Sequence, residues 1–309
     1  MRDVLQSRYY NDKLRAAIDN HKCEHCLRHK LNGPGYGLLS ERDVQVAPFE
    51  EIAVNLIGPW QVKVNGRLVE FKALTIIDTV TNLVELIRID SKEAEHVRAK
   101  FEQAWLSRYP WPKKIIHDPG GEFIAGVFKK LLKTIQCKDA EGCAKNAQSN
   151  AICERMHQTV GNVLRTTLHS NPPKDMDNAR DIIDDALATA MHAMQCNVTT
   201  ALGSLPGALV FGRDMFLNVP LTADWVTISK HREQLLNENL CKANLKRRAY
   251  DYAVGDKVLK KVWKPTKLGE RTSGPYTIKR VHINGNVTVE LDEDVYERIN
   301  VRRIIPYRV

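Results

Sequence analysis

Three apolar runs open the central part of the chain, and their pattern predicts β-strands. They are EEIAVNLIGPW (50–60), VEFKALTIIDT (69–79) and LVELIRI (83–89), each rich in β-branched residues and bounded by turn residues. The dipeptide Asn65-Gly66 lies between the first two runs. Because this dipeptide favours a tight hairpin, the three runs are expected to form a meander.

Helical spacing follows these strands. Ser91 is expected to cap a helix that continues to about Trp105, and apolar residues at helical spacing predict a second helix over 124–135. Between them the short run KIIHD (114–118) predicts a fourth strand. A segment containing Cys137 is expected to be a strand or a loop, and further helices follow it. The alternation of strands and helices indicates an α/β fold with a mixed sheet flanked by helices.

The last third of the chain has a different pattern. Residues 200–225 contain several Pro and Gly and are expected to be irregular, whereas 226–250 predict a charged helix. After this helix, apolar and basic residues alternate between Gly and Asn turns in the runs GDKVLKKVW, GPYTIKRV, GNVTVELD and YERINVRRIIPY. This pattern predicts a small all-β domain of about five strands.

The charge of the chain is concentrated at its end. The net charge of the 309 residues is +9, and residues 230–309 hold 18 Lys/Arg against 10 Asp/Glu. Such asymmetry favours a polyanionic partner, with nucleic acid before an acidic membrane surface; a basic surface that serves only solubility is the alternative. No apolar run of about 18 residues predicts a membrane-spanning helix, so no membrane partner is expected.

The seven cysteines are scattered at irregular spacing, and only Cys23 and Cys26 are closely paired. An odd, irregular set is typical of a reducing intracellular compartment rather than of a disulfide framework. The Cys-x-x-Cys pair is half of a four-ligand zinc site, and no second pair follows it. A complete zinc site within the chain is therefore not expected, and a site that lacks its upstream ligands is the favoured interpretation.

Two carboxylates in the middle of the chain have the arrangement of metal ligands. Asp118 follows an apolar strand and enters a Pro-Gly-Gly turn, and Glu154 lies near the start of a predicted helix, with 35 residues between the two. Two or three converging carboxylates can hold Mg²⁺ ions for phosphodiester chemistry, and a third ligand should come from a neighbouring strand.

The helix of Glu154 has one polar stripe. It contains Glu154, His157, Gln158, Gly161 and Arg165, and the opposite stripe is apolar, as required for packing on a sheet. The polar stripe could lie against a phosphate backbone. From periodicity alone, a solvated helix face is favoured over this interpretation.

These motifs, in this order, resemble the integrase of a gypsy-type long-terminal-repeat retrotransposon, a relative of retroviral integrases. The resemblance runs across nearly the whole sequence. It is carried by CEHC, IAVNLIGPW, IIDTVTNLVEL, HDPGGEF, NAQSNAICERMHQTV, ALGSLPGALVFGRD, GDKVLKK, GPYTIKRV and ERINVRRIIPY. Each motif alone is weak, and their order and spacing together make the match specific.

The resemblance implies four segments. They are a truncated zinc-module remnant and linker over 1–44, a ribonuclease-H-like catalytic core over 45–215, a helical linker over 216–250 and a basic, SH3-like β-barrel over 251–309 that binds DNA. It also implies a homo-oligomer that acts on element ends and target DNA, and nuclear localisation for a eukaryotic element.

The resemblance further implies a catalytic site and shows a departure from it. The family hallmark is two Asp and one Glu, the last two separated by 35 residues, which matches Asp118 and Glu154. The first Asp of the family falls in the strand motif that ends in LIGPW, and this chain has Asn55 there. Asn55 lowers the charge of the ligand set from −3 to −2, which is expected to impair binding of two Mg²⁺ or Mn²⁺ ions. Asp78 corresponds to a separate position and is not assumed to substitute.

The expected DNA contacts combine the resemblance with the basic pattern. The candidates are Gln158, Arg165, Lys260, Lys261, Lys264, Arg271, Lys279 and Arg280. Contacts of this kind to phosphates would be salt-dependent and weakly specific for sequence. The expected function is metal-dependent 3′ processing and strand transfer, impaired by Asn55. The alternatives are a DNA-binding protein without catalysis and a nuclease on the same fold.

Overall fold

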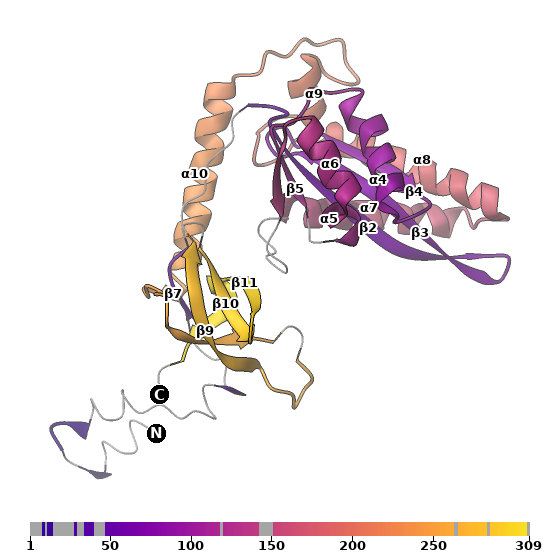
Figure 1. Ribbon diagram of the computed structural model, residues 1–309. Helices are drawn as coiled ribbons and strands as arrows, with labels where there is room; N and C mark the ends of the chain where they lie inside the picture. The colour runs from indigo at the N-terminus through magenta and orange to yellow at the C-terminus, as the bar shows by residue number, and fades with distance from the viewer. Residues whose placement is uncertain are drawn as a thin grey trace. The chain divides into compact units, whose positions relative to one another are not determined.

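The computed structural model describes residues 8–9, 11–14, 28–29, 34–39, 47–117, 120–141, 151–262, 265–282 and 285–307, and for 140–141 and 151–155 it describes the backbone alone. Contacts divide the chain into two compact units. The core unit is Asp43–Glu238, and the β unit combines Met1–Arg42 with Asn239–Val309. Figure 1 shows the elements of both units.

A five-stranded mixed sheet forms the centre of the core unit, with the order β4-β3-β2-β5-β6. Strands β2, β3 and β4 pair antiparallel, whereas β5 pairs parallel with both β2 and β6. The predicted meander and the fourth strand are confirmed. The strands are β2 (Glu51–Val64), β3 (Arg67–Asp78), β4 (Val84–Ile89), β5 (Lys114–His117) and β6 (Lys138–Glu141).

The hairpin between β2 and β3 turns at the predicted dipeptide. Asn65 and Gly66 both have positive φ angles, 48° and 78°. Two successive residues with positive φ are the signature of a type I′ turn, whose twist matches that of the flanking strands. The turn therefore fixes the register in which Val64 lies opposite Arg67.

Helices cover both faces of this sheet (Figure 1). On one face α7 and α8 pack against Ala53 and Ile57 of β2. On the other, the segments from α4 to α6 pack against Ile52 and Val54. The helical segments are α4 (Ala94–Phe101), the π-helix η1 (Glu102–Leu106), α5 (Gly121–Ile124), α6 (Gly126–Thr134), α7 (Ala151–Ser170) and α8 (Met176–Gln195).

Two helix predictions before α7 need correction. The first helix begins at Ala94, because Glu93 is its N-cap; Ser91 Oγ accepts a hydrogen bond from Glu93 N (3.0 Å) before the helix starts. The helix expected over 124–135 is observed as α6 and begins at Gly126, because the backbone of Ala125 is extended (ψ 143°) and separates α6 from α5, which ends at Ile124.

Two predictions after α8 also need correction. The segment expected to be irregular contains α9 (Pro206–Phe211), with Pro206 in its first turn and a left-handed Gly212 at its end. Pro at the start and Gly at the end are normal helix boundaries, and together they enclose a short helix here. The charged helix α10 (Trp225–Asn244) ends before Tyr250, because residues 247–248 form strand β7 (Arg247–Arg248).

The β unit contains a five-stranded antiparallel sheet with the order β11-β10-β9-β8-β12. Its core is formed by alternate residues, among them Val258, Ile278 and Val287. The predicted small all-β domain is therefore confirmed. Its strands are β8 (Lys257–Lys261), β9 (Thr272–His282), β10 (Asn286–Asp292), β11 (Val295–Asn300) and β12 (Ile304–Pro306), with a 3₁₀ turn η2 (Val301–Arg303) before β12.

A short N-terminal strand belongs to the same unit, which the sequence pattern did not indicate. β1 (Gly35–Tyr36) pairs parallel with β7. The Arg247 side chain donates to the carbonyls of Gly37 (2.5 Å), Tyr36 and Val301 (3.2 Å), so one guanidinium group joins the N-terminal segment to η2. We call residues 34–39 the strap.

Candidate functional site

Asn55 lies in the middle of β2, where the strand carries a polar residue on a face that is otherwise apolar. Its neighbours on this face, Ala53 and Ile57, belong to the core formed with α7 and α8. Because side chains alternate along a strand, Asn55 points toward this helical layer too. Its side chain is partly exposed, and Oδ1 accepts a hydrogen bond from Leu56 N at 2.8 Å.

The parallel pairing of β2 and β5 ends beside Asn55. The last pair is Val54 opposite His117, and the next residues in the sequence are Asn55 and Asp118. Asp118 itself lies outside the described residues. The structure thus brings the residue before Asp118 next to the residue before Asn55.

Glu154 lies in the first turns of α7, and its side chain is outside the described part of the chain. Further along α7, Met156, Val160 and Leu164 are buried in the core that contains Ala53 and Ile57, and Val163 packs against this core. Gln158 and Arg165 are exposed, and Arg165 Nη1 donates to Asn162 Oδ1 (2.9 Å). The helix that carries Glu154 therefore covers the face of the sheet toward which Asn55 points.

Thr75 is a polar neighbour of Asn55 that sequence reasoning missed. It lies directly opposite Asn55 in the β2–β3 ladder and is fully buried. Within the described residues, its hydroxyl has no hydrogen-bond partner. In the sequence, Thr75 is visible only as a polar residue in an apolar strand. Its burial opposite Asn55 depends on the cross-strand register, which the sequence does not show. An unsatisfied buried hydroxyl costs free energy, so the polar pair Asn55–Thr75 marks an unusual point in this core.

His117 occupies the opposite face of the sheet. Its buried ring lies 5.3 Å from the ring of Phe123, and its Nε2 is 2.7 Å from Asp139 Oδ1 on β6. These two contacts join the end of β5 to α5 and to β6. They place His117 in the packing below the strand end rather than on the face of Asn55.

Asp78 is a buried carboxylate with a structural role. It lies opposite Ile52, three residues along β2 from Asn55, and its oxygens accept hydrogen bonds from Phe49 N (3.1 Å), Val80 N (3.4 Å), Thr81 N (2.9 Å) and Thr81 Oγ1 (2.6 Å). Burial raises the pKa of Asp78, although these hydrogen bonds favour its charged form. The three contacts with Val80 and Thr81 hold the turn between β3 and β4, and the fourth holds the segment before β2, so Asp78 has a structural role of its own.

Most of the predicted metal ligands lie outside the described residues. Among the described residues, no group of three or more His, Cys, Asp or Glu side chains is arranged to hold a metal ion. Cys23 and Cys26, the half zinc site, and the acid Asp118 all lie outside the described residues. The ligand set Asn55, Asp118 and Glu154 therefore stays a prediction, for which the structure supplies the strand register and the course of α7.

The basic candidates of the β unit differ in their surroundings. Lys260 forms an ion pair with Glu297, and Lys279 forms one with Glu290 at 2.8 Å. Burial and the nearby Arg247 lower the pKa of Lys261. By contrast, Arg271 and Arg280 are exposed, and Lys264 lies outside the described part. The charges of Arg271 and Arg280 are thus more available to a phosphate than those of Lys260 and Lys279.

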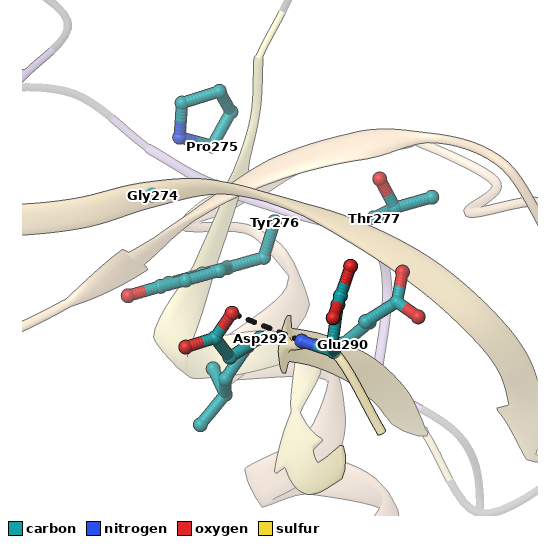
Figure 2. Close-up of a pocket in the computed structure, with 8 residues that line it drawn as sticks. Gly274, Pro275, Tyr276, Thr277, Glu290 and Asp292 are labelled. Carbon is teal, nitrogen blue, oxygen red and sulfur yellow. Dashed lines mark hydrogen bonds between the residues drawn. The ribbon is translucent and has the colours of Figure 1, made fainter. Parts of the chain in front are cut away.

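An open concavity of about 570 Å³ on the β unit carries the opposite charge. It is lined by Tyr276 together with Glu290, Asp292 and Glu293. Figure 2 shows the carboxylates of Glu290 and Asp292 beside the ring of Tyr276. Glu290 is paired with Lys279, but Asp292 and Glu293 would repel a phosphate backbone, so this hollow is not a part of the candidate DNA surface.

Comparisons with known proteins bear on the chain as a whole. No family model matches it. The retrovirus-related Pol polyprotein from transposon 412 of Drosophila melanogaster is 24% identical over 282 residues, which cover 83% of this chain and 22% of that polyprotein. The chain thus spans less than a quarter of the length of this relative.

Solved structures show similarity in fold. A chain in the cryo-EM structure of the simian T-cell lymphotropic virus intasome, in complex with PP2A regulatory subunit B56 gamma, has a TM-score of 0.66 at 13% identity. That match covers 100% of this chain and 95% of the other. The HTLV-2 integrase catalytic core domain, solved with magnesium in a trimeric form, covers 55% of this chain at 18% identity with a TM-score of 0.41.

Together these findings support the resemblance that the sequence motifs indicated. The similarity to the transposon polyprotein runs along most of the chain, and the fold similarity to the intasome chain runs along all of it. In the described residues, no helix is both long and apolar enough to cross a membrane. The chain has an integrase-like fold, with a mixed-sheet α/β core followed by a small β domain, and it is similar in sequence to part of a retrotransposon Pol polyprotein.

Proposed function

We propose that this chain is a DNA-binding, integrase-like protein whose metal-dependent polynucleotidyl transfer is impaired by Asn55. The observation that carries the proposal is the position of Asn55. It lies on β2 beside the end of β5 and points toward the layer of α7, the helix of Glu154. The similarity to the transposon 412 polyprotein supports the reaction class.

The proposed ligand set is Asn55, Asp118 and Glu154. All three offer oxygen atoms, which are the ligands that Mg²⁺ and Mn²⁺ prefer. When bound, two such ions would supply positive charge at the attacking and leaving oxygens of a phosphodiester. The oxygen chemistry fits, but the carboxamide of Asn55 brings no charge, and its Oδ1 already accepts a bond from Leu56 N. We therefore expect weak metal binding at this position.

The reaction that the resemblance implies has two steps. Water hydrolyses a phosphodiester near the 3′ end of element DNA, which releases the terminal nucleotides and leaves a 3′ hydroxyl. This hydroxyl then attacks a phosphodiester of the target DNA, and the 3′ oxygen of the cut target strand leaves as a hydroxyl. In these steps Asp118 and Glu154 would supply the charged ligands. Gln158 and Arg165, exposed on α7, would position the DNA backbone, and the basic β unit would hold it through phosphate contacts.

The size of the impairment follows from the missing charge. One unit charge at about 4 Å from a cation is worth roughly 4 kcal/mol at an effective dielectric constant near 20. Each 1.4 kcal/mol corresponds to a factor of about ten in rate. Even half of this energy would slow strand transfer by more than about tenfold. Binding of DNA, by contrast, should not depend on the charge at position 55.

A strand-transfer assay on the full chain tests the proposal. Asn55→Asp restores the carboxylate and should raise product formation at least about tenfold in Mg²⁺ or Mn²⁺. Asn65→Asp is the matched control, because it makes the same change at the exposed tip of the same hairpin. It should leave the rate unchanged. Addition of Asp118→Asn to the Asn55→Asp variant should abolish the gain.

Other outcomes would favour the alternatives. If Asn55→Asp stays inactive while DNA binding is intact, the chain is a DNA-binding protein without catalysis. Strand transfer by the natural chain at the rate of Asn55→Asp would contradict the impairment. Nicked products without joined products, from either protein, would indicate a nuclease on the same fold.

We also propose that the chain acts as a homo-oligomer on DNA and works in the nucleus. The similar chain from the simian virus was solved as part of an intasome, and this similarity supports a homo-oligomeric form of the present chain. Light scattering of the chain with and without duplex DNA should show a mass above that of one copy. A monomeric mass in both conditions would rule out the oligomer. Imaging of a tagged full chain in cells of a eukaryotic host tests the nuclear localisation.

A further inference from the structure

Two arginines and a histidine converge on the outer face of the β unit, on strands β9, β10 and β11. In the ladder Thr288 of β10 lies directly opposite both Arg280 of β9 and Arg298 of β11. Directly opposed side chains share a face, and their Cβ atoms are roughly 5 Å apart. The two arginines therefore flank Thr288 with their Cβ atoms on the order of 10 Å apart.

His282 completes this group. Its Nε2 is 2.9 Å from Thr288 Oγ1, and its strand position lies opposite Asn286, two residues along β10 from Thr288. Burial, Arg298 and Arg280 lower the pKa of His282. Both guanidinium groups thus act on the same imidazole, in keeping with their strand positions on either side of Thr288.

The charges of this group are available to a ligand. Arg280 and Arg298 are exposed, and within the described residues neither guanidinium group forms an ion pair or a hydrogen bond. Glu290, the next outward-facing residue of β10, is paired with Lys279. Two unpaired cations on one face, with a hydroxyl and an imidazole between them, offer the donors that a phosphate group requires.

We propose that Arg280 and Arg298, together with Thr288 and His282, form a clamp for one phosphate group of a nucleic-acid backbone. The clamp rests on the proposed DNA binding and deepens it, because it assigns a specific phosphate contact to a chain that carries many basic residues. Arg298 was not among the candidates from the sequence. The acidic concavity at Glu290 and Asp292 borders the clamp and would direct the backbone away from that side.

The clamp couples binding to protonation. Among the described residues, the charged groups that act on His282 are Arg280 on β9 and Arg298 on β11, and both disfavour imidazolium in the free protein. A bound phosphate cancels part of this repulsion, so the pKa of His282 is higher in the complex than in the free chain. DNA binding then takes up a proton in the window between these two pKa values, and affinity rises as pH falls through it.

Binding of a fluorescent duplex to the full chain, measured by anisotropy at several salt concentrations, tests the clamp. Arg280→Gln and Arg298→Gln should each weaken binding about tenfold at low salt. Arg67→Gln is the matched control, because Arg67 is an exposed strand residue of the core unit and loses the same charge. It should change affinity less than about twofold. Arg298→Lys should recover only part of the loss, because a lysine cannot form the bidentate contact.

The salt dependence separates a single shared phosphate from diffuse charge. One phosphate contact contributes a slope of about 0.9 in the logarithmic plot of affinity against salt. Each single variant and the double variant should therefore lose about one unit of slope. A loss of about two units in the double variant would show two separate contacts and overturn the clamp.

The remaining outcomes are equally decisive. If the natural chain binds duplex and both arginine variants match Arg67→Gln, the clamp is wrong and the proposed DNA binding stands. If the natural chain does not bind duplex at all, the DNA binding fails and the clamp fails with it. His282→Gln should remove the gain in affinity between pH 7.5 and 5.5, and an unchanged gain would overturn the role of His282. Thermal unfolding of each variant shows whether the fold is kept.

Discussion

At the scale of single residues, the most informative pair is Asn55 and Thr75. Asn55 stands where the resemblance places a metal-binding acid, and Thr75 lies opposite it with a buried hydroxyl that has no partner in the described part of the chain. A buried hydroxyl without a hydrogen bond costs about 1–3 kcal/mol. Thr75→Val should therefore raise the free energy of unfolding by about 1 kcal/mol, measured by urea denaturation of the full chain. A clear loss of stability would show that a water molecule or an ion satisfies this hydroxyl.

Asp78 gives a second prediction at this scale. Asp78→Ala leaves two buried backbone N–H groups, one partly buried N–H group and one hydroxyl without an acceptor, so the free energy of unfolding at pH 7 should fall by about 3 kcal/mol. Because the folded pKa lies above 3.8, the folded state keeps a proton that the unfolded state has lost. Stability of the natural chain therefore falls as pH rises through this window, and the variant should lack that component. Urea denaturation at several pH values checks both points. If the stability of the natural chain and of Asp78→Ala changed equally with pH, the pH-dependent component would not come from Asp78.

A sequence motif identifies Asn55 as a candidate site residue, whereas no motif identifies Thr75 as its buried neighbour, and the reason is physical. The position of Asn55 follows from a motif that is continuous in the chain, IAVNLIGPW. The burial of Thr75 follows from the β2–β3 register and from the packing of helices more than seventy residues later. The same limit applies to Arg298, whose proposed role depends on its pairing with Thr288 and on the pairing of Thr288 with Arg280, which no local pattern indicates.

At the scale of elements, the strands and long helices could be predicted because period and turn chemistry are local. The strap could not, because β1 and β7 are separated by more than two hundred residues and each has only two residues. Non-local pairing of such short segments leaves no periodicity in the sequence. Side chains carry this contact instead: Asn244 exchanges two hydrogen bonds with the backbone of Leu39 (2.9 and 3.2 Å), and Arg247 holds Gly37.

A glycine substitution tests the strap. Gly37 has a φ of 74°, and a Cβ there would lie 2.9 Å from the Tyr252 ring. Gly37→Ala should cost about 1–2 kcal/mol from the left-handed backbone, and more from the contact with the ring. Gly255→Ala is the matched control, since Gly255 has a φ of 92° and open space around its would-be Cβ. Thermal unfolding should show the larger loss for Gly37→Ala. Equal losses would show that the strap does not pack against Tyr252.

At the scale of the whole molecule, charge is divided between the two units. The β unit holds 24 Lys/Arg against 13 Asp/Glu, whereas the core unit holds 22 against 24. The unit with the candidate metal ligands is therefore slightly acidic, and the excess positive charge belongs to the other unit. Electrostatic affinity for a polyanion follows positive charge, so the β unit should supply most of the affinity for DNA.

Paired substitutions in the full chain test this division. Lys267→Gln with Arg271→Gln removes two exposed charges from the β unit, and Lys130→Gln with Lys133→Gln removes two exposed charges from α6 of the core unit. Both doubles lower the net charge equally, and α6 lies on the face of the sheet opposite Asn55. If the β unit carries the phosphate contacts, only the first double should lose up to about two units of salt slope in duplex binding. Equal losses would mean that net charge alone governs binding, whereas a greater loss from the α6 double would assign the DNA surface to the core unit.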